Sequence, residues 1–220
     1  AEMPSGHFLY RAVLHGINQK RGQAMNKKKS FTLTAIICMN IFFILMTILF
    51  YVLWRKLGGG GIQAAYITFL TTSYHFVMRI AVGEIVTVIY SNRKFDLTSV
   101  GFRQLKFEPK LYKALRVKKW KKFSITAKPN QFDLEQNSAE SLLHNIAMAE
   151  LGHRIIMVLS FVPLILIIPY GTPAVFIITS VCACLIDLKY VIIQRYNRPR
   201  VLKLIKMTNN QSKKIKQAAR

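Results

Sequence analysis

The sequence has few acidic residues and few cysteines for its length. Its 220 residues include 9 Asp or Glu against 32 Lys or Arg, which gives a formal net charge of +23. A nucleic-acid-binding domain with that charge is normally far less apolar than the 52% hydrophobic content found here, so we expect no nucleic-acid partner. Cys38, Cys182 and Cys184 all lie within apolar runs, where they predict neither a disulfide framework nor a metal site.

Charge is also missing from long stretches of the chain. Phe31 to Leu53 contains no charged residue and is long enough to cross a hydrocarbon layer of about 30 Å as a helix. Three more long apolar segments follow, at Ile62 to Tyr90, Leu151 to Ile168 and Pro173 to Ile193. We therefore predict an all-α integral membrane protein with four transmembrane helices. Its expected parts are a first hairpin at 31–90, a loop at 91–150, a second hairpin at 151–198 and a basic tail at 199–220.

The basic residues gather in the N-terminal segment 1–30, in the 91–150 loop and beyond Gln194, whereas the two short connections between spans carry few. By the positive-inside rule, the two termini and the long loop are expected on the cytoplasmic side of a multi-pass protein. Met25 and the lysines after it resemble a natural start, so residues 1–24 are set aside as an extension. The basic stretches beside the spans favour anionic membrane lipid as a partner.

The 91–150 loop is expected to carry short amphipathic helices at the membrane surface. Pro109 is suited to the first turn of a helix. Trp120 follows Lys119 in a lysine-rich stretch, a composition typical of a helix in the headgroup layer. Asn137 and Glu140 have the spacing of a variant capping box, which predicts another helix that continues into the third span.

Ionisable residues within spans are costly and are therefore candidates for function. His75 and Arg79 in the second span lie four residues apart and share a helical face. They form either a secondary polar pocket or a surface feature in which Arg79 and Glu84 extend to the cytoplasmic boundary.

The third span begins with a second candidate pair. Glu150 and His153 lie three residues apart, so their side chains can meet on one face. A carboxylate beside an imidazole orients the ring and raises its basicity, as a general base requires. The alternative is that Glu150 pairs with Arg154 at the membrane boundary.

The fourth span carries Asp187, Gln194 and Arg198 on one face. Pro199 disfavours helical geometry in the residue before it, so we predict that the helix ends at Arg198. Because the third and fourth spans are antiparallel neighbours, their cytoplasmic ends meet. We expect one polar pocket there, with the carboxylate–imidazole pair opposite the arginines.

Three short motifs point to a family. Glu150-Leu-Gly-His153, the Gln-Arg-Tyr-Asn-Arg-Pro-Arg stretch at 194–200 and the Val-Lys-Lys-Trp-Lys stretch at 117–121 resemble the glycosyl-4,4'-diaponeurosporenoate acyltransferase family of Gram-positive bacteria, over about residues 107–204. The resemblance implies an enzyme of the bacterial cell membrane. It would esterify a hydroxyl of a lipid-linked sugar, namely a glycosylated carotenoid of staphyloxanthin-type biosynthesis.

Residue types and their placement suggest roles for single residues in such a transfer. His153, oriented by Glu150, would act as the general base, with acyl-CoA as donor and no bound cofactor. The expected substrate-binding residues are the three arginines Arg195, Arg198 and Arg200 for phosphates, Tyr196 or Asn197 for the oxyanion, and Gln194, Asp187, Lys119 and Trp120 around them.

A reading from another class stays open. A non-catalytic membrane protein that binds anionic lipid or scaffolds a partner would use the same arginines and would not need His153. The sequence also lacks an aspartate five residues after any histidine, the arrangement of glycerolipid acyltransferases. The acyl-transfer mechanism is therefore inferred from residue types and their placement.

Overall fold

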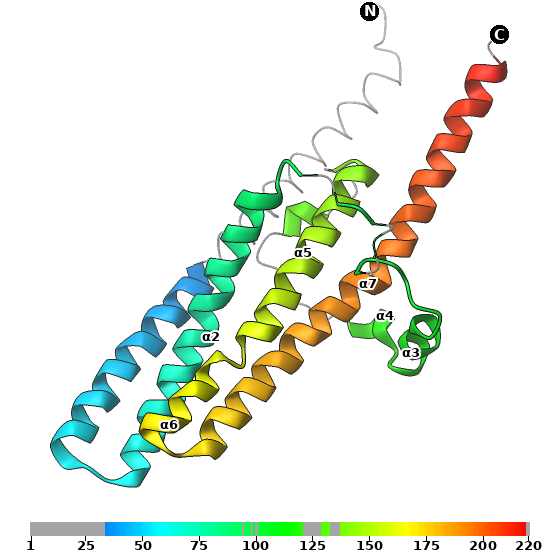
Figure 1. Ribbon diagram of the computed structural model, residues 1–220. Coiled ribbons are helices and arrows are strands. Elements are labelled where there is room, and N and C mark those ends of the chain that lie inside the picture. The colour runs from blue at the N-terminus through cyan, green and yellow to red at the C-terminus, as the bar shows by residue number, and fades with distance from the viewer. Residues whose placement is uncertain are drawn as a thin grey trace, which may run out of the picture.

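The computed structural model describes residues 34–93, 95–97, 99, 101–120, 129–132 and 137–218. The described residues form helices and their connections, without strands (Figure 1). Four helices are long and apolar enough to cross a membrane, which confirms the predicted number of spans: Thr34–Leu57, Gly60–Tyr90, Ala139–Tyr170 and Pro173–Gln211. The basic segment predicted at 1–30 lies outside the described residues.

The first hairpin joins the helix Thr34–Leu57 to α2 (Gly60–Tyr90) through a glycine turn. Gly58 and Gly59 have φ angles of 66° and 90°, a region that glycine enters without steric cost. The two helices then pack through aromatic rings, among them Phe50 stacked on Phe69 with centroids 5.1 Å apart. The short connection expected between these spans is therefore a tight turn.

The third span is built from three consecutive helical pieces, α5 (Ala139–Leu159), η3 (Val162–Leu166) and α6 (Ile167–Tyr170). Pro163 lies in the first turn of η3. Because proline has no N–H and clashes with the preceding turn, the regular α-helix gives way at this point.

The start of α5 differs from the prediction by one residue. Ser138 is the N-cap, and its hydroxyl accepts a hydrogen bond of 3.1 Å from the backbone N–H of Ser141. The capping box predicted from Asn137 and Glu140 is therefore wrong in register. The prediction that this helix continues into the third span is confirmed.

α7 (Pro173–Ala218) runs straight through Pro199, so the predicted helix end at Arg198 is wrong. An interior proline costs a helix about 3 kcal/mol. Burial of a valine side chain recovers about 1.5–3 kcal/mol, and Val201 is buried in the turn just after the proline. It packs against three buried side chains of α5: Leu142, Leu143 and Ile146.

α2, α5 and α7 lie side by side and contact one another (Figure 1). One part of the core joins α2 to α5 through the buried side chains Met78, Val82, Val86, Met148 and Ile156. The helix Thr34–Leu57 packs on the outside of this group, against α2, and most of its large apolar side chains are exposed.

The short helices α3 (Glu108–Ala114) and α4 (Val117–Trp120) lie beside α7, away from α2 and α5 (Figure 1). Tyr112 and Val117 are buried against Ile193 of α7, which anchors both helices. α3 has proline in its first turn, as Pro109 predicted. A 3-10 turn, η2 (Pro129–Phe132), packs against α5.

Candidate active site

Asp187 lies at the centre of a polar cluster between the three core helices. Its side chain is fully buried, with Oδ1 2.8 Å from Nδ1 of His153 on α5. Its Oδ2 accepts a hydrogen bond of 2.5 Å from Nη2 of Arg79 on α2, and Arg79 also donates to the carbonyl of Ala183 at 3.1 Å. One carboxylate on α7 therefore joins a cation and an imidazole from the two neighbouring helices.

His153 has one ring nitrogen bonded and the other available. The ring stacks on Tyr190, with centroids 4.8 Å apart and an interplanar angle of 10°, and 26% of the side chain is exposed. Nδ1 contacts Asp187, whereas Nε2 has no hydrogen-bond partner among the described residues. An imidazole that donates its Nδ1 proton to a carboxylate presents the Nε2 lone pair as a base.

Arg79 pairs with a carboxylate of another span. Its side chain, 24% exposed, turns inward to Asp187. His75 is buried and is linked to Arg79 through its backbone carbonyl, which accepts from Nη1 at 3.0 Å. Its ring nitrogens have no hydrogen-bond partner within the described chain. Arg79 thus belongs to the cluster of Asp187, and the His75 ring lies beside it.

Glu150 belongs to a second cluster. Its fully buried carboxylate forms ion pairs with Arg154, Arg195 and Arg198. Of the two sequence readings, the pairing with Arg154 is the one present, and the structure contradicts the predicted contact with His153. Asp187 occupies the position next to the imidazole instead.

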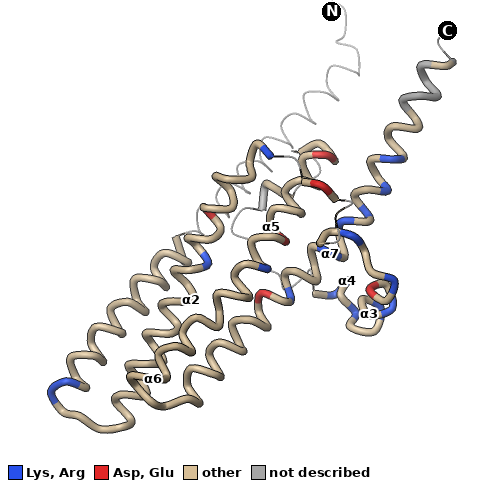
Figure 2. Tube along the Cα trace, in the orientation of Figure 1, with Lys and Arg blue, Asp and Glu red and all other residues tan. Residues whose placement is uncertain are grey.

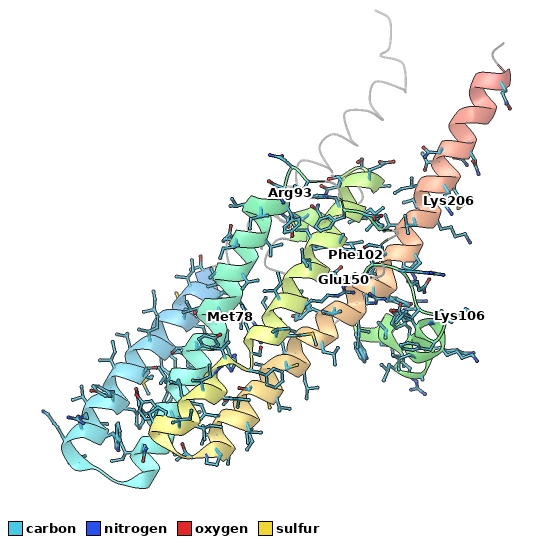
Figure 3. The ribbon with its side chains drawn as sticks, viewed as in Figure 1. Met78, Arg93, Phe102, Lys106, Glu150 and Lys206 are labelled. Atoms are coloured by element: carbon cyan, nitrogen blue, oxygen red, sulfur yellow. The ribbon has the colours of Figure 1, made fainter. Side chains whose placement is uncertain are left out.

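The arginines of this second cluster also tie the 101–108 segment to the core. Arg195 donates from Nε to Oε1 of Glu108 at 2.8 Å and from Nη1 to the carbonyl of Gly101 at 3.0 Å. The guanidinium groups of Arg154 and Arg198 lie over the ring of Phe102, which Figure 3 shows next to Glu150.

These contacts bear on the predicted phosphate ligands. Arginines with little solvent exposure need nearby carboxylates or carbonyls, and Arg195 and Arg198 have theirs within the protein. In this structure these two predicted phosphate ligands are engaged by Glu108 and Glu150. Gln194 is likewise buried on the α7 face that carries Asp187.

Glu108 and Tyr112 form a contact on α3 that was not predicted. The Tyr112 hydroxyl donates to Oε2 of Glu108 at 2.7 Å. Burial and this hydrogen bond raise the pKa of Tyr112 well above its ordinary value, so the phenol stays neutral. The signal in the sequence is their spacing of four residues, which brings two side chains together on one face of a helix.

The family profile of glycosyl-4,4'-diaponeurosporenoate acyltransferases matches residues 91–207. The chain belongs to this family. The match covers α5, most of α7 and the segments between α2 and α5, so it includes His153, Asp187 and the Glu150 cluster, and it confirms the resemblance seen in the sequence. Arg79 lies before the matched region. A search of curated proteins and a search of solved structures gave no match.

Membership of this family indicates an acyltransferase in carotenoid biosynthesis, and the four apolar helices indicate a membrane protein. The arrangement around His153 is compatible with acyl transfer, because it joins a buried carboxylate, an oriented imidazole and an open ring nitrogen. The arginine-rich stretch at 194–200 lies on α7, beyond the turn that contacts His153, and within the matched region.

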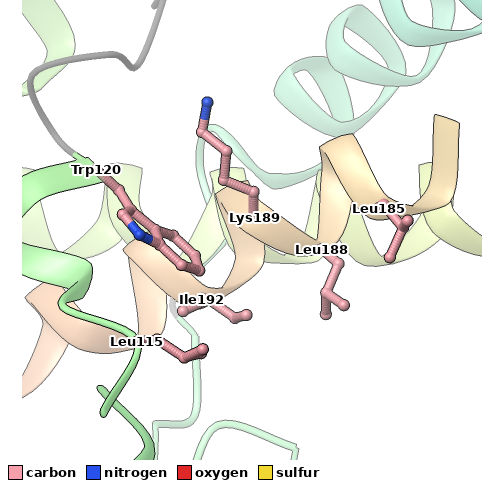
Figure 4. A pocket seen from close by; sticks show the side chains of 6 residues that line it. All are labelled: Leu115, Trp120, Leu185, Leu188, Lys189 and Ile192. Carbon is pink, nitrogen blue, oxygen red and sulfur yellow. The ribbon is translucent and has the colours of Figure 1, made fainter. Parts of the chain in front are cut away.

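Two clefts lie between α7 and the α3–α4 segment. The first is apolar, has a volume of about 470 Å³ and is shown in Figure 4; its lining residues are Leu115, Trp120, Leu185, Leu188, Lys189 and Ile192. The second has a volume of about 600 Å³ and is largely basic. Of the predicted binding residues, Trp120 lines the first cleft, and Lys119, Tyr196 and Arg200 line the second.

Proposed function

We propose that this protein transfers a fatty acyl group from acyl-CoA to a sugar hydroxyl of a glycosylated carotenoid within a bacterial cell membrane. The observation that carries the proposal is the pairing of His153 with the buried Asp187, which leaves Nε2 of the imidazole available to a substrate hydroxyl. The family match supports the same chemistry, because it indicates acyl transfer in carotenoid biosynthesis.

In the proposed mechanism, Nε2 of His153 takes the proton of the sugar hydroxyl while the hydroxyl oxygen attacks the acyl carbonyl carbon of the thioester. The new C–O bond forms first, and the tetrahedral intermediate then breaks its C–S bond. The proton on His153 passes to the departing sulfur, which leaves as a thiol. The products are a sugar ester and free CoA, and His153 returns to its starting state.

Asp187 and Arg79 act on the imidazole without touching the substrate. Asp187 fixes the ring so that Nε2 is the open nitrogen, and it stabilises the imidazolium that forms during the transfer. Arg79 balances the charge of Asp187, which would otherwise be buried alone in the membrane interior. Both are therefore positioning residues in the proposal.

The span that carries His153 also offers apolar surface. Farther from the arginine cluster, Val158, Phe161 and Val162 are exposed apolar side chains. In a membrane these side chains would contact hydrocarbon, where the polyene chain of a carotenoid also lies.

The test replaces His153 by glutamine and measures acyl transfer to a glycosylated diaponeurosporenoate in membranes. We expect transfer to fall at least about 100-fold, because general-base catalysis contributes factors of that order. His144→Gln is the matched control, since His144 lies on α5 in contact with the Phe95 ring and outside the Asp187 cluster.

Undiminished transfer by His153→Gln protein would contradict the assignment. The competing non-catalytic reading predicts a different pattern. In that case the unaltered protein transfers no acyl group to any hydroxyl acceptor, and anionic lipid binding is the same in both histidine variants.

A further inference from the structure

The two clefts follow one another along one face of α7. Leu185, Leu188, Ile192, Tyr196 and Arg200 recur every three or four residues, a spacing that keeps them on one side of a helix. That side faces α3 and α4, whereas the side that carries the buried aspartate faces α2 and α5 (Figure 1). One side of α7 thus carries Asp187, and another side lines the two clefts.

The two clefts differ in chemistry. The first cleft, along the membrane-crossing part of α7, is lined by apolar side chains except at Lys189 (Figure 4). The other, nearer the arginine-rich motif, is lined by no acidic residue, and α3 and its surroundings carry many basic positions in Figure 2. Five of its lining side chains are cationic: Lys113, Arg116, Lys118, Lys119 and Arg200.

These five cations differ from the arginines of the Glu150 cluster. Within the described part of the chain, none of them forms an ion pair with a carboxylate, whereas Arg154, Arg195 and Arg198 all do. The positive charge of the five cations is therefore not balanced by carboxylates of the described residues, and the cleft favours an anion. Several cations in one cleft suit a ligand with several phosphate groups better than a lipid headgroup with one.

The basic cleft is held in shape by the fold. Arg116 has a φ of 51°, a left-handed conformation that costs a non-glycine residue roughly 1 kcal/mol. It separates α3 from α4, and Val117 next to it is buried against α7. On the opposite wall, the guanidinium of Arg200 lies 4.0 Å from the centroid of the Tyr196 ring. The cations are thus carried by anchored elements.

We propose that this face of α7 is the acyl-donor site. The acyl chain lies in the apolar cleft, and the phosphate groups of the CoA carrier lie in the basic cleft. The proposal rests on the proposed acyl transfer and adds where the donor binds. Tyr190 lies between the apolar cleft and His153. Its ring stacks on the imidazole, and its centroid is 5.2 Å from Nζ of Lys189, a lining residue of the cleft.

Binding is measured on the full chain in nanodiscs of neutral phosphatidylcholine, with a fluorescent palmitoyl-CoA and empty discs as background. The variant Lys113→Gln/Lys118→Gln/Lys119→Gln is expected to weaken binding at least about tenfold, since several charge-assisted contacts are lost. The matched control is Lys106→Gln/Lys110→Gln/Lys203→Gln, which removes the same charge from exposed residues outside the cleft and is expected to bind as the unaltered protein does.

The apolar cleft is tested separately by chain length. Leu188→Trp fills part of the cleft and is expected to shift the preference among acyl-CoA donors towards shorter chains. Ile178→Trp adds the same bulk to an exposed position of α7 outside the cleft and is expected to leave the preference unchanged.

Equal binding by the two triple variants would overturn the proposal. The proposal would also be overturned if the cleft variant lost binding as expected but phosphatidylglycerol displaced the probe as well as unlabelled acyl-CoA does. The cleft would then be a lipid-headgroup site. His153→Gln protein is expected to bind the probe normally. If His153→Gln protein bound the probe and still transferred the acyl group, the general-base assignment would be refuted and the donor site would stand.

Discussion

Replacing Asp187 by asparagine separates the structural and chemical roles of the polar cluster. Asparagine keeps the size of the side chain and removes its charge. The loss falls on two partners at once, the guanidinium of Arg79 and Nδ1 of His153. Stability and acyl transfer should therefore both decrease, and for different reasons.

The magnitudes follow from the burial of each partner. Removing one partner of a buried ion pair costs about 3–5 kcal/mol. Because the Arg79 side chain is 24% exposed, we expect a smaller loss, about 2–3 kcal/mol in the free energy of unfolding. Transfer should fall by about 10²–10⁴-fold, since an amide can donate to Nδ1 and leave the proton of the imidazole on Nε2.

A second substitution distinguishes the two losses. In Arg79→Met/Asp187→Asn protein no charge is left unpaired in this cluster, so stability should return to within about 1 kcal/mol of the original. Transfer should stay as low as in the single variant, because the imidazole still lacks its carboxylate. Thermal unfolding in detergent, followed by the fluorescence of Trp54 and Trp120, reports stability, and the membrane assay reports transfer.

Recovery of transfer together with stability in the double variant would refute the reasoning. It would mean that Asp187 only offsets the charge of Arg79 and that His153 needs no carboxylate. Normal transfer by the Asp187→Asn variant alone would have the same meaning.

Three further predictions concern stability and are checked by thermal unfolding. Glu150→Gln leaves the buried Arg198 without its carboxylate and should cost about 3 kcal/mol; an unchanged unfolding temperature would show that the cluster contributes nothing. Pro199→Ala should raise stability by about 1–3 kcal/mol, because α7 already continues through this position, and a loss would contradict a continuous helix. Gly171→Ala should cost about 1–2 kcal/mol from its φ of 67° alone, since no atom lies near the added carbon; Gly61→Ala, at an ordinary φ, should cost nothing.

The spans were predictable because the membrane imposes a length and forbids charge. The run at 31–53 and the glycines at 58 and 59 mark a helix and a turn without any knowledge of packing. The end of α7 was not predictable in the same way. A local rule about proline predicted a stop at Arg198, and the burial of Val201 against α5 outweighs it.

The sequence alone places Asp187 within reach of His153, although proximity along the chain favours Glu150 as its partner. Glu150 is close along the chain, whereas Asp187 is close in space because the two helices form a hairpin. His153 and Asp187 lie at similar distances from the turn at Gly171, and a count of residues on both sides would have brought them together. The ion pairs of Glu150 depend on how 101–108 folds back, and no periodicity in the sequence marks that path.

The motif at 194–200 divides between the two sides of α7, and this division explains why it contains more than a row of charges. Arg195 and Arg198 face Glu150 and hold the 101–108 segment, whereas Tyr196 and Arg200 line the basic cleft. Substitutions in the two groups should therefore have different effects on stability and on acyl transfer. Arg198→Gln should lower the unfolding temperature, and Arg200→Gln should leave it unchanged and raise the concentration of acyl-CoA needed for half-maximal transfer. If both substitutions lowered stability equally, the cleft side of α7 would be another part of the core and not a binding face.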